Sequence, residues 1–220
     1  MNIELNTVSA ENQVAFSSDV SLFGSPLAKT KILVLGNSIT RHGPCPAIGW
    51  ELDCGMAASA PEKDYVHRLY AKLQEAGKSV YMRVKHCSDW ENGFLKEDAL
   101  SKFKEDRAFG ADIVVFRLGE NVKRDLRPHF LQGLQSLIPY VCPTGTVVYT
   151  TCFWKNEQVD NAIRSFALSR NEVCLDGCLS DDESNMALGL FAHEGVAIHP
   201  GDKGMEQLAS LIFHQLSKMI

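Results

Sequence analysis

The amino-acid sequence predicts an α/β domain with a central, mostly parallel sheet of about five strands covered by helices. Short apolar runs without polar alternation, such as residues 31–35 and 112–118, are typical of strands buried on both faces of a parallel sheet. These runs alternate along the chain with segments of helical periodicity. That order predicts right-handed βαβ units, with helices on both sides of the sheet.

Local patterns place the individual elements. We expect strands at residues 31–35, 79–84, 112–118, 146–151 and 172–175, and helices at residues 60–76, 95–109, 130–140, 157–169 and 203–219. Ser59 and Glu62 have the spacing of a capping box at the start of the first helix. Residues 1–30 are polar and irregular, so we expect an N-terminal arm or short strand laid on a domain of residues 31–220.

The composition is that of an ordinary globular domain. The chain has 220 residues, enough for one core without covalent staples, and 45% hydrophobic with 22% charged residues is a common balance. A net charge of −5 and the lack of a basic block argue against nucleic acid as a partner. No apolar stretch approaches 18 residues, so we expect no membrane span.

The cysteines and the start of the sequence bear on the compartment. The seven cysteines include no CxxC pair, and we expect buried reduced thiols rather than a zinc site. The first residues lack the basic and apolar regions of a signal peptide. These features favour the cytoplasm, although a mature secreted form would also fit them.

Three short polar motifs fall where a parallel sheet places its ligands, beyond the carboxyl ends of the strands. Residues 36–38 (Gly-Asn-Ser) follow the first strand, residues 119–121 (Gly-Glu-Asn) follow the third, and His199 precedes the last helix. A histidine is the usual base for a serine nucleophile because its pKa lies near neutrality. An asparagine side chain can donate N–H bonds into the same crevice. Taken singly, each motif also fits an ordinary turn or helix start.

In order and spacing the motifs resemble the SGNH (GDSL-like) serine hydrolases, over residues 31 to about 220. The resemblance implies a three-layer flavodoxin-like sandwich and ester hydrolysis through an acyl-enzyme, often of acetyl groups on carbohydrates. It implies Ser38 as nucleophile, His199 as base, and Asn121 with the Ser38 N–H as oxyanion donors. No metal or organic cofactor is implied, and the expected partner is a small-molecule or carbohydrate ester.

Two departures concern the residues around the nucleophile and the oxyanion. Asn37 stands where the family usually has aspartate, a change that we expect to be tolerated. The family's second motif supplies a glycine N–H to the oxyanion; here Gly93 is the candidate, and the backbone N–H of Glu91 is an alternative.

A third departure concerns the acid that would orient the histidine. The family usually has aspartate three residues before its histidine, and here that position is Val196. Glu194 is the nearest preceding acid. The sequence therefore leaves open a Ser38–His199–Glu194 triad or a Ser–His dyad held by a backbone carbonyl.

Other interpretations of the same residues remain. The general α/β-hydrolase fold is disfavoured because Thr40 replaces the second glycine of Gly-x-Ser-x-Gly. A flavodoxin-like module cradling a phosphate or cofactor with residues 36–43 would have the same fold, and a hydrolase scaffold that has lost its activity would have the same motifs. The three tryptophans, at positions 50, 90 and 154, are candidates for stacking on a sugar ring.

Overall fold

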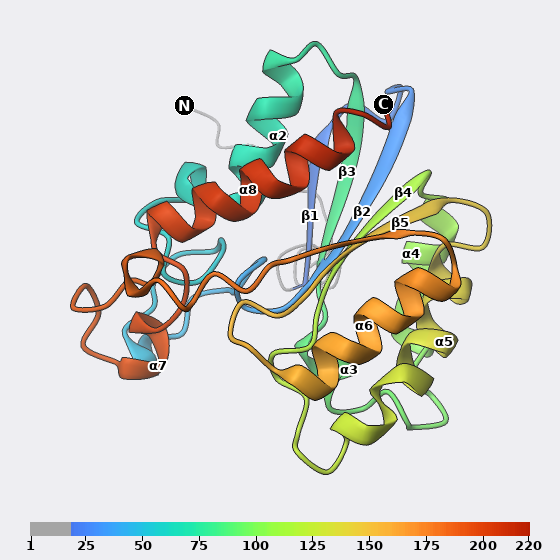
Figure 1. Cartoon of the computed structure of the whole chain (residues 1–220). Coiled ribbons are helices and arrows are strands. Elements are labelled where there is room, and N and C mark those ends of the chain that lie inside the picture. The colour runs from blue at the N-terminus through green and yellow to red at the C-terminus, as the bar shows by residue number, and fades with distance from the viewer. Residues whose placement is uncertain (1–18) are drawn as a thin grey trace, which may run out of the picture.

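The computed structural model describes residues 19–220, which form three layers with a six-stranded sheet in the middle (Figure 1). The strands are β1 (Val20–Gly24), β2 (Thr30–Gly36), β3 (Val80–His86), β4 (Ile113–Arg117), β5 (Thr146–Thr150) and β6 (Val173–Leu175). They lie in the order β1-β3-β2-β4-β5-β6, and every neighbouring pair is parallel except β1 with β3. The predicted α/β class and all five predicted strands are confirmed.

The sixth strand, β1, comes from the segment expected to be an arm or a short strand laid on the domain. It pairs with β3 at the edge of the sheet, from Val20 opposite Lys85 to Gly24 opposite Tyr81. Partly buried and exposed side chains alternate along most of it, as expected for an edge strand. Residues 1–18 of the expected arm lie outside the described residues.

Helices cover both faces of the sheet. In Figure 1, α2 (Tyr65–Glu75) and α8 (Asp202–Leu216) lie on one face, and α4 (Lys104–Phe109), α5 (Phe130–Val141) and α6 (Glu157–Ser169) lie on the other. Two single-turn helices, α3 (Ser88–Glu91) and α7 (Glu194–Ala197), sit in loops. The predicted helix 95–109 is shorter than expected: only a 3₁₀ turn (Ser101–Phe103) and α4 form.

The start of α2 also differs from the sequence expectation. Asp64 caps the helix by accepting a hydrogen bond from the His67 N–H at 2.8 Å. Ser59 does not form the expected box with Glu62. Its N–H and hydroxyl donate to the Asp202 carboxylate instead, at 2.9 and 2.7 Å, which joins this loop to the start of α8.

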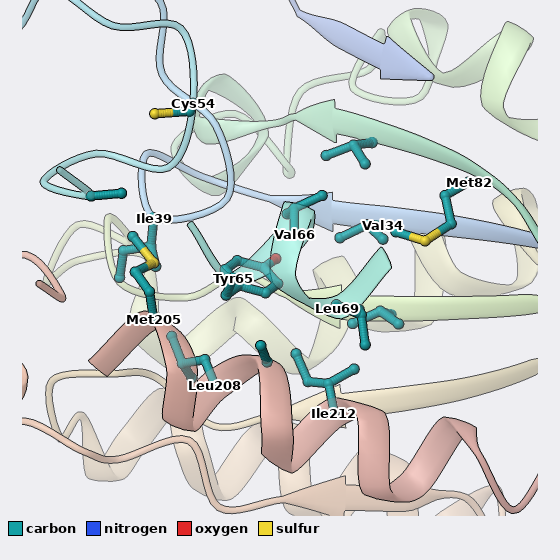
Figure 2. Packing of buried hydrophobic residues seen from close by; sticks show 14 of the residues in the cluster. Val34, Ile39, Cys54, Tyr65, Val66, Leu69, Met82, Met205, Leu208 and Ile212 are labelled. Atoms are coloured by element: carbon teal, nitrogen blue, oxygen red, sulfur yellow. The ribbon is translucent and has the colours of Figure 1, made fainter. Parts of the chain in front are cut away.

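Each helical layer has its own apolar core against the sheet. Figure 2 shows the layer under α8, where Leu208 and Ile212 face Leu69 of α2 and the strand residues Val34 and Met82. All five side chains are fully buried. The sheet is thus packed against helices on both of its faces. Among residues 19–220, none of the helices has both the length and the apolar character needed to cross a membrane.

Candidate active site

Ser38 lies on a tight turn directly after β2. The carbonyl of Asn37 accepts hydrogen bonds from the N–H groups of Thr40 and Arg41, at 2.9 and 3.0 Å, so the chain makes one helical turn as it leaves the strand. A Cβ at position 36 would lie 1.7 Å from the Thr40 hydroxyl oxygen, so only glycine allows this close return of the chain. The turn leaves Ser38 half-buried at the carboxyl edge of the sheet.

The Ser38 hydroxyl and the His199 ring are in hydrogen-bond contact. The distance from Ser38 Oγ to His199 Nε2 is 2.9 Å, and His199 Nδ1 lies 2.6 Å from the carbonyl oxygen of Gly195. Because a carbonyl only accepts, Nδ1 carries the proton and donates it. The Nε2 lone pair then faces the serine hydroxyl, which is the tautomer that a general base needs.

The contact that orients His199 comes from the backbone. The last carbonyls of a helix have no partner within the helix, and α7 offers that of Gly195 to the His199 ring. Glu194 begins α7 and is exposed. Val196, at the family's aspartate position, is fully buried in the apolar layer that also contains α8, where a carboxylate would lack water. The geometry therefore favours the dyad over the triad with Glu194.

Burial controls the charge of His199. It lowers the pKa of the ring to about 4, and the nearby positive charge of Arg117 adds to this, while the Gly195 carbonyl opposes it. His199 is therefore neutral at physiological pH and free to accept a proton.

Asn121 is held by a buried carboxylate. Its side-chain Nδ2 donates to Glu91 Oε2 at 2.7 Å, and its backbone N–H lies 3.2 Å from Glu91 Oε1. The backbone N–H of Gly119 donates to the same Oε1 at 2.6 Å. Gly119 has φ of +144°, and a Cβ there would lie 2.6 Å from Val159, so this turn requires glycine. Glu91 is fully buried at the end of α3.

A second buried carboxylate, Glu120, completes the cluster. It accepts hydrogen bonds from Asn37 Nδ2 at 2.6 Å, from the Phe153 N–H at 2.9 Å and from the Arg117 guanidinium. Asn37 Nδ2 also lies 3.2 Å from Glu91 Oε1, and its Oδ1 accepts from Arg117 at 3.2 Å. An asparagine at position 37 thus donates to two carboxylates, where an aspartate would add a third negative charge.

Burial and Glu120 together perturb the ionisation of Glu91. Burial raises the pKa of Glu91 to about 7, with a further contribution from the charge of Glu120, against the lowering effect of the N–H groups that Glu91 accepts. Its ionisation is thus brought close to physiological pH.

Solved structures with the same fold include several esterases. LAE5, an α/β hydrolase enzyme from the metagenome of Lake Arreo in Spain, aligns with a TM-score of 0.60 at 17% identity, over 90% of this chain and 98% of its own. A variant of Axe2, an acetyl-xylooligosaccharide esterase from Geobacillus stearothermophilus, aligns with a TM-score of 0.59 at 17% identity, over 88% and 95%. A lipolytic protein of the G-D-S-L family from Desulfitobacterium hafniense aligns at 0.53 and 16%, over 84% and 99%.

The chain has the SGNH (GDSL-like) hydrolase fold. No family model matches its sequence, and no curated protein matches it either. The likeness is therefore one of structure at low sequence identity, and it shows the fold that the motifs led us to expect.

On this SGNH fold, the structure brings together some of the predicted site residues and not others. Ser38 and His199 are in contact, and Asn121 is joined through Glu91 to Asn37, the residue before the nucleophile. The Gly93 N–H donates to the Trp90 carbonyl at 3.0 Å, so it is engaged within the chain rather than directed at an oxyanion.

The three tryptophans differ in whether they lie in the core or beside the site. Trp50 and Trp90 are 1% and 5% exposed and belong to the core, which removes them as stacking platforms. Trp154 is half-buried with its ring edge-to-face with that of His199, the centroids 5.1 Å apart, and its Nε1 donates to the Ile198 carbonyl. It is the tryptophan that borders the site.

Sequence reasoning missed the buried charges of the cluster. Arg117 ends an otherwise apolar strand, and Glu120 stands between the glycine and asparagine of a motif. A charge in a buried strand needs a partner, so Arg117 was a signal for a nearby carboxylate. Within residues 19–220, no group of three or more His, Cys, Asp or Glu side chains is arranged to hold a metal ion.

We expect Glu194→Gln to lower kcat/KM on an ester by less than about three-fold, whereas loss of a working triad carboxylate costs ~10⁴-fold in a serine protease. The reason is that His199 Nδ1 already donates to the Gly195 carbonyl. The measurement is steady-state kinetics of both proteins on one nitrophenyl ester. A loss of a hundred-fold or more would restore Glu194 as the third member.

Proposed function

We propose that this chain is a serine esterase that hydrolyses carboxylic esters through an acyl-enzyme. The observation that carries the proposal is the 2.9 Å contact between Ser38 Oγ and His199 Nε2, with the ring held in the basic tautomer by the Gly195 carbonyl. A turn serine paired with an oriented neutral imidazole is the arrangement that activates a hydroxyl nucleophile. The fold, which esterases share, supports the same reaction.

Acylation follows from this geometry. His199 Nε2 takes the hydroxyl proton as Ser38 Oγ attacks the ester carbonyl, and the carbonyl oxygen becomes an oxyanion. Asn121 uses one Nδ2–H on Glu91, and its second N–H remains for the oxyanion together with the Ser38 backbone N–H. The intermediate collapses when His199 returns the proton to the departing alcohol.

Deacylation repeats the steps with water. His199 removes a proton from water, which attacks the acyl carbonyl, and the proton then passes to Ser38 Oγ as the carboxylic acid leaves. The neutral ring that burial maintains is the form required at the start of both halves.

We place short acyl groups, acetyl above all, on a carbohydrate or other small polar alcohol as the substrate. Trp154 beside His199 offers an aromatic edge next to the nucleophile. An aromatic side chain suits a sugar ring, and the likeness to an acetyl-xylooligosaccharide esterase supports the same proposal.

We expect Ser38→Ala to abolish ester hydrolysis while the protein stays folded, since the hydroxyl is the group that attacks. Turnover of nitrophenyl acetate and labelling by a fluorophosphonate probe measure this, with circular dichroism to verify the fold. A wild-type protein that neither turns over esters nor reacts with the probe would be a binding module or an inactive scaffold, and the proposal would fail.

We expect Asn121→Ala to lower kcat by roughly 10²–10³-fold, the loss typical of one oxyanion donor, with little change in KM. The donor acts on charge that develops only in the transition state. Steady-state kinetics on the best ester measure the two constants separately. An effect on KM alone would make Asn121 a substrate-binding residue instead.

We expect acetyl esters to be cleaved faster than octanoyl esters of the same alcohol. The comparison uses kcat/KM over a series of nitrophenyl esters from acetyl to octanoyl, followed by acetylated xylooligosaccharides. A preference for octanoyl would overturn the proposed acyl group without affecting the assignment of Ser38.

A further inference from the structure

We propose that Glu91 is a positioning residue, whose ionised carboxylate fixes Asn121 and its turn in the orientation that stabilises the oxyanion. The proposal rests on the proposed esterase function and adds to it a residue that does not itself touch the substrate. It is carried by the hydrogen bonds that converge on the carboxylate.

Every group bonded to Glu91 is a donor. Oε1 accepts from the Gly119 N–H, the Asn121 N–H and Asn37 Nδ2, at 2.6, 3.2 and 3.2 Å, and Oε2 accepts from Asn121 Nδ2 at 2.7 Å. An ionised carboxylate only accepts, so it matches all four donors at once. A protonated acid or an amide at this position would place one of its own hydrogens against an N–H group.

The bond to Asn121 decides which way its amide faces. Asn121 is exposed to the crevice, and a free asparagine side chain there would rotate and present either oxygen or nitrogen. With Glu91 Oε2 as partner the nitrogen is fixed, and with Oε1 on two backbone N–H groups the turn is fixed as well. One carboxylate therefore sets both the main chain and the side chain of the donor.

Glu91 is itself held rigidly, although α3 is only one turn long. The neighbouring Trp90 is 5% exposed, and its ring packs against those of Phe94, Phe116 and Phe130, with centroids 5.6 to 6.1 Å apart. This aromatic cluster anchors α3 to the core. The carboxylate is thus a fixed reference to which the turn at residues 119–121 is attached.

The charge of Glu91 depends on its surroundings. Glu120 faces it from the turn after β4 and is itself bonded by Arg117, and the buried Cys87 thiol lies just before α3. Burial and Glu120 bring its pKa to about 7, whereas that of His199 lies at about 4. If ionised Glu91 is needed, the acid limb of kcat/KM belongs to Glu91 and lies near neutrality, well above the value set by His199.

The kinetic test compares two isosteric changes on the same short helix. Glu91→Gln removes the buried carboxylate, and Asp89→Asn removes an exposed one that pairs with Lys102 at the surface. We expect Glu91→Gln to lower kcat by about ten-fold or more with KM nearly unchanged, because a displaced oxyanion donor acts on the transition state. The neutral-pH acid limb should disappear in this variant, and Glu91→Asp should recover part of kcat. Asp89→Asn should match the wild type in all three respects.

A second measurement does not depend on turnover, and its pH titration uses the wild-type protein. The Asn121 side-chain amide resonances of the ¹⁵N-labelled wild-type protein, identified by their loss in Asn121→Ala, should shift with the ionisation of Glu91 as pH rises from 5 to 9. They should also be displaced in Glu91→Gln. If the wild type lacks esterase activity but the resonances titrate, the esterase proposal fails and the positioning link stands. Resonances that do not move, with kcat of Glu91→Gln equal to that of Asp89→Asn, would overturn the positioning role while leaving the esterase assignment intact.

Discussion

The geometry of the sheet edge that carries Ser38 depends on satisfying two buried carboxylates. Glu91 and Glu120 have almost no contact with water, and each would be costly to bury without partners. Their donors come from three different places along the sheet edge: Asn37 after β2, residues 117–121 at the end of β4, and Phe153 after β5. Meeting the hydrogen-bonding needs of the two acids therefore fixes the loops from three strands relative to one another before any substrate arrives.

The departures from the family pattern make sense as parts of this arrangement. Asn37 can donate to both carboxylates, which an aspartate could not. Val196 belongs to the apolar layer under α8, and the backbone carbonyl of Gly195 takes over the task of holding the His199 tautomer. Because this carbonyl has no full charge, it offsets only part of the effect of burial on the histidine. A triad places a carboxylate beside the histidine. In this chain the Glu91 carboxylate is instead bonded to Asn121.

The sequence was a good guide wherever the signal was local. Local apolar patterns predicted strands β2 to β6, and Ser38, Asn121 and His199 were singled out because each lies near an element boundary. The sequence was a poor guide where the hydrogen-bond partners lie far apart along the chain. Ser59 has the spacing of a capping box, but it bonds Asp202, 143 residues away, and the partners of Glu91 lie 28 to 54 residues along the chain. Competition between local and remote partners is decided by the packed fold, and a local pattern carries no information on its outcome.

Arg117 shows what such a preorganised edge requires. It ends the central strand β4 with its side chain 1% exposed, a position that an apolar residue would fill more cheaply. Its guanidinium bonds Glu120 and Asn37, so it supplies the positive charge that two adjacent carboxylates need. The same charge lowers the pKa of His199, which weakens the base slightly. The arrangement thus combines a less basic histidine with a fixed Asn121 side chain. In the proposed esterase, this favours preoriented dipoles over base strength as the source of the rate.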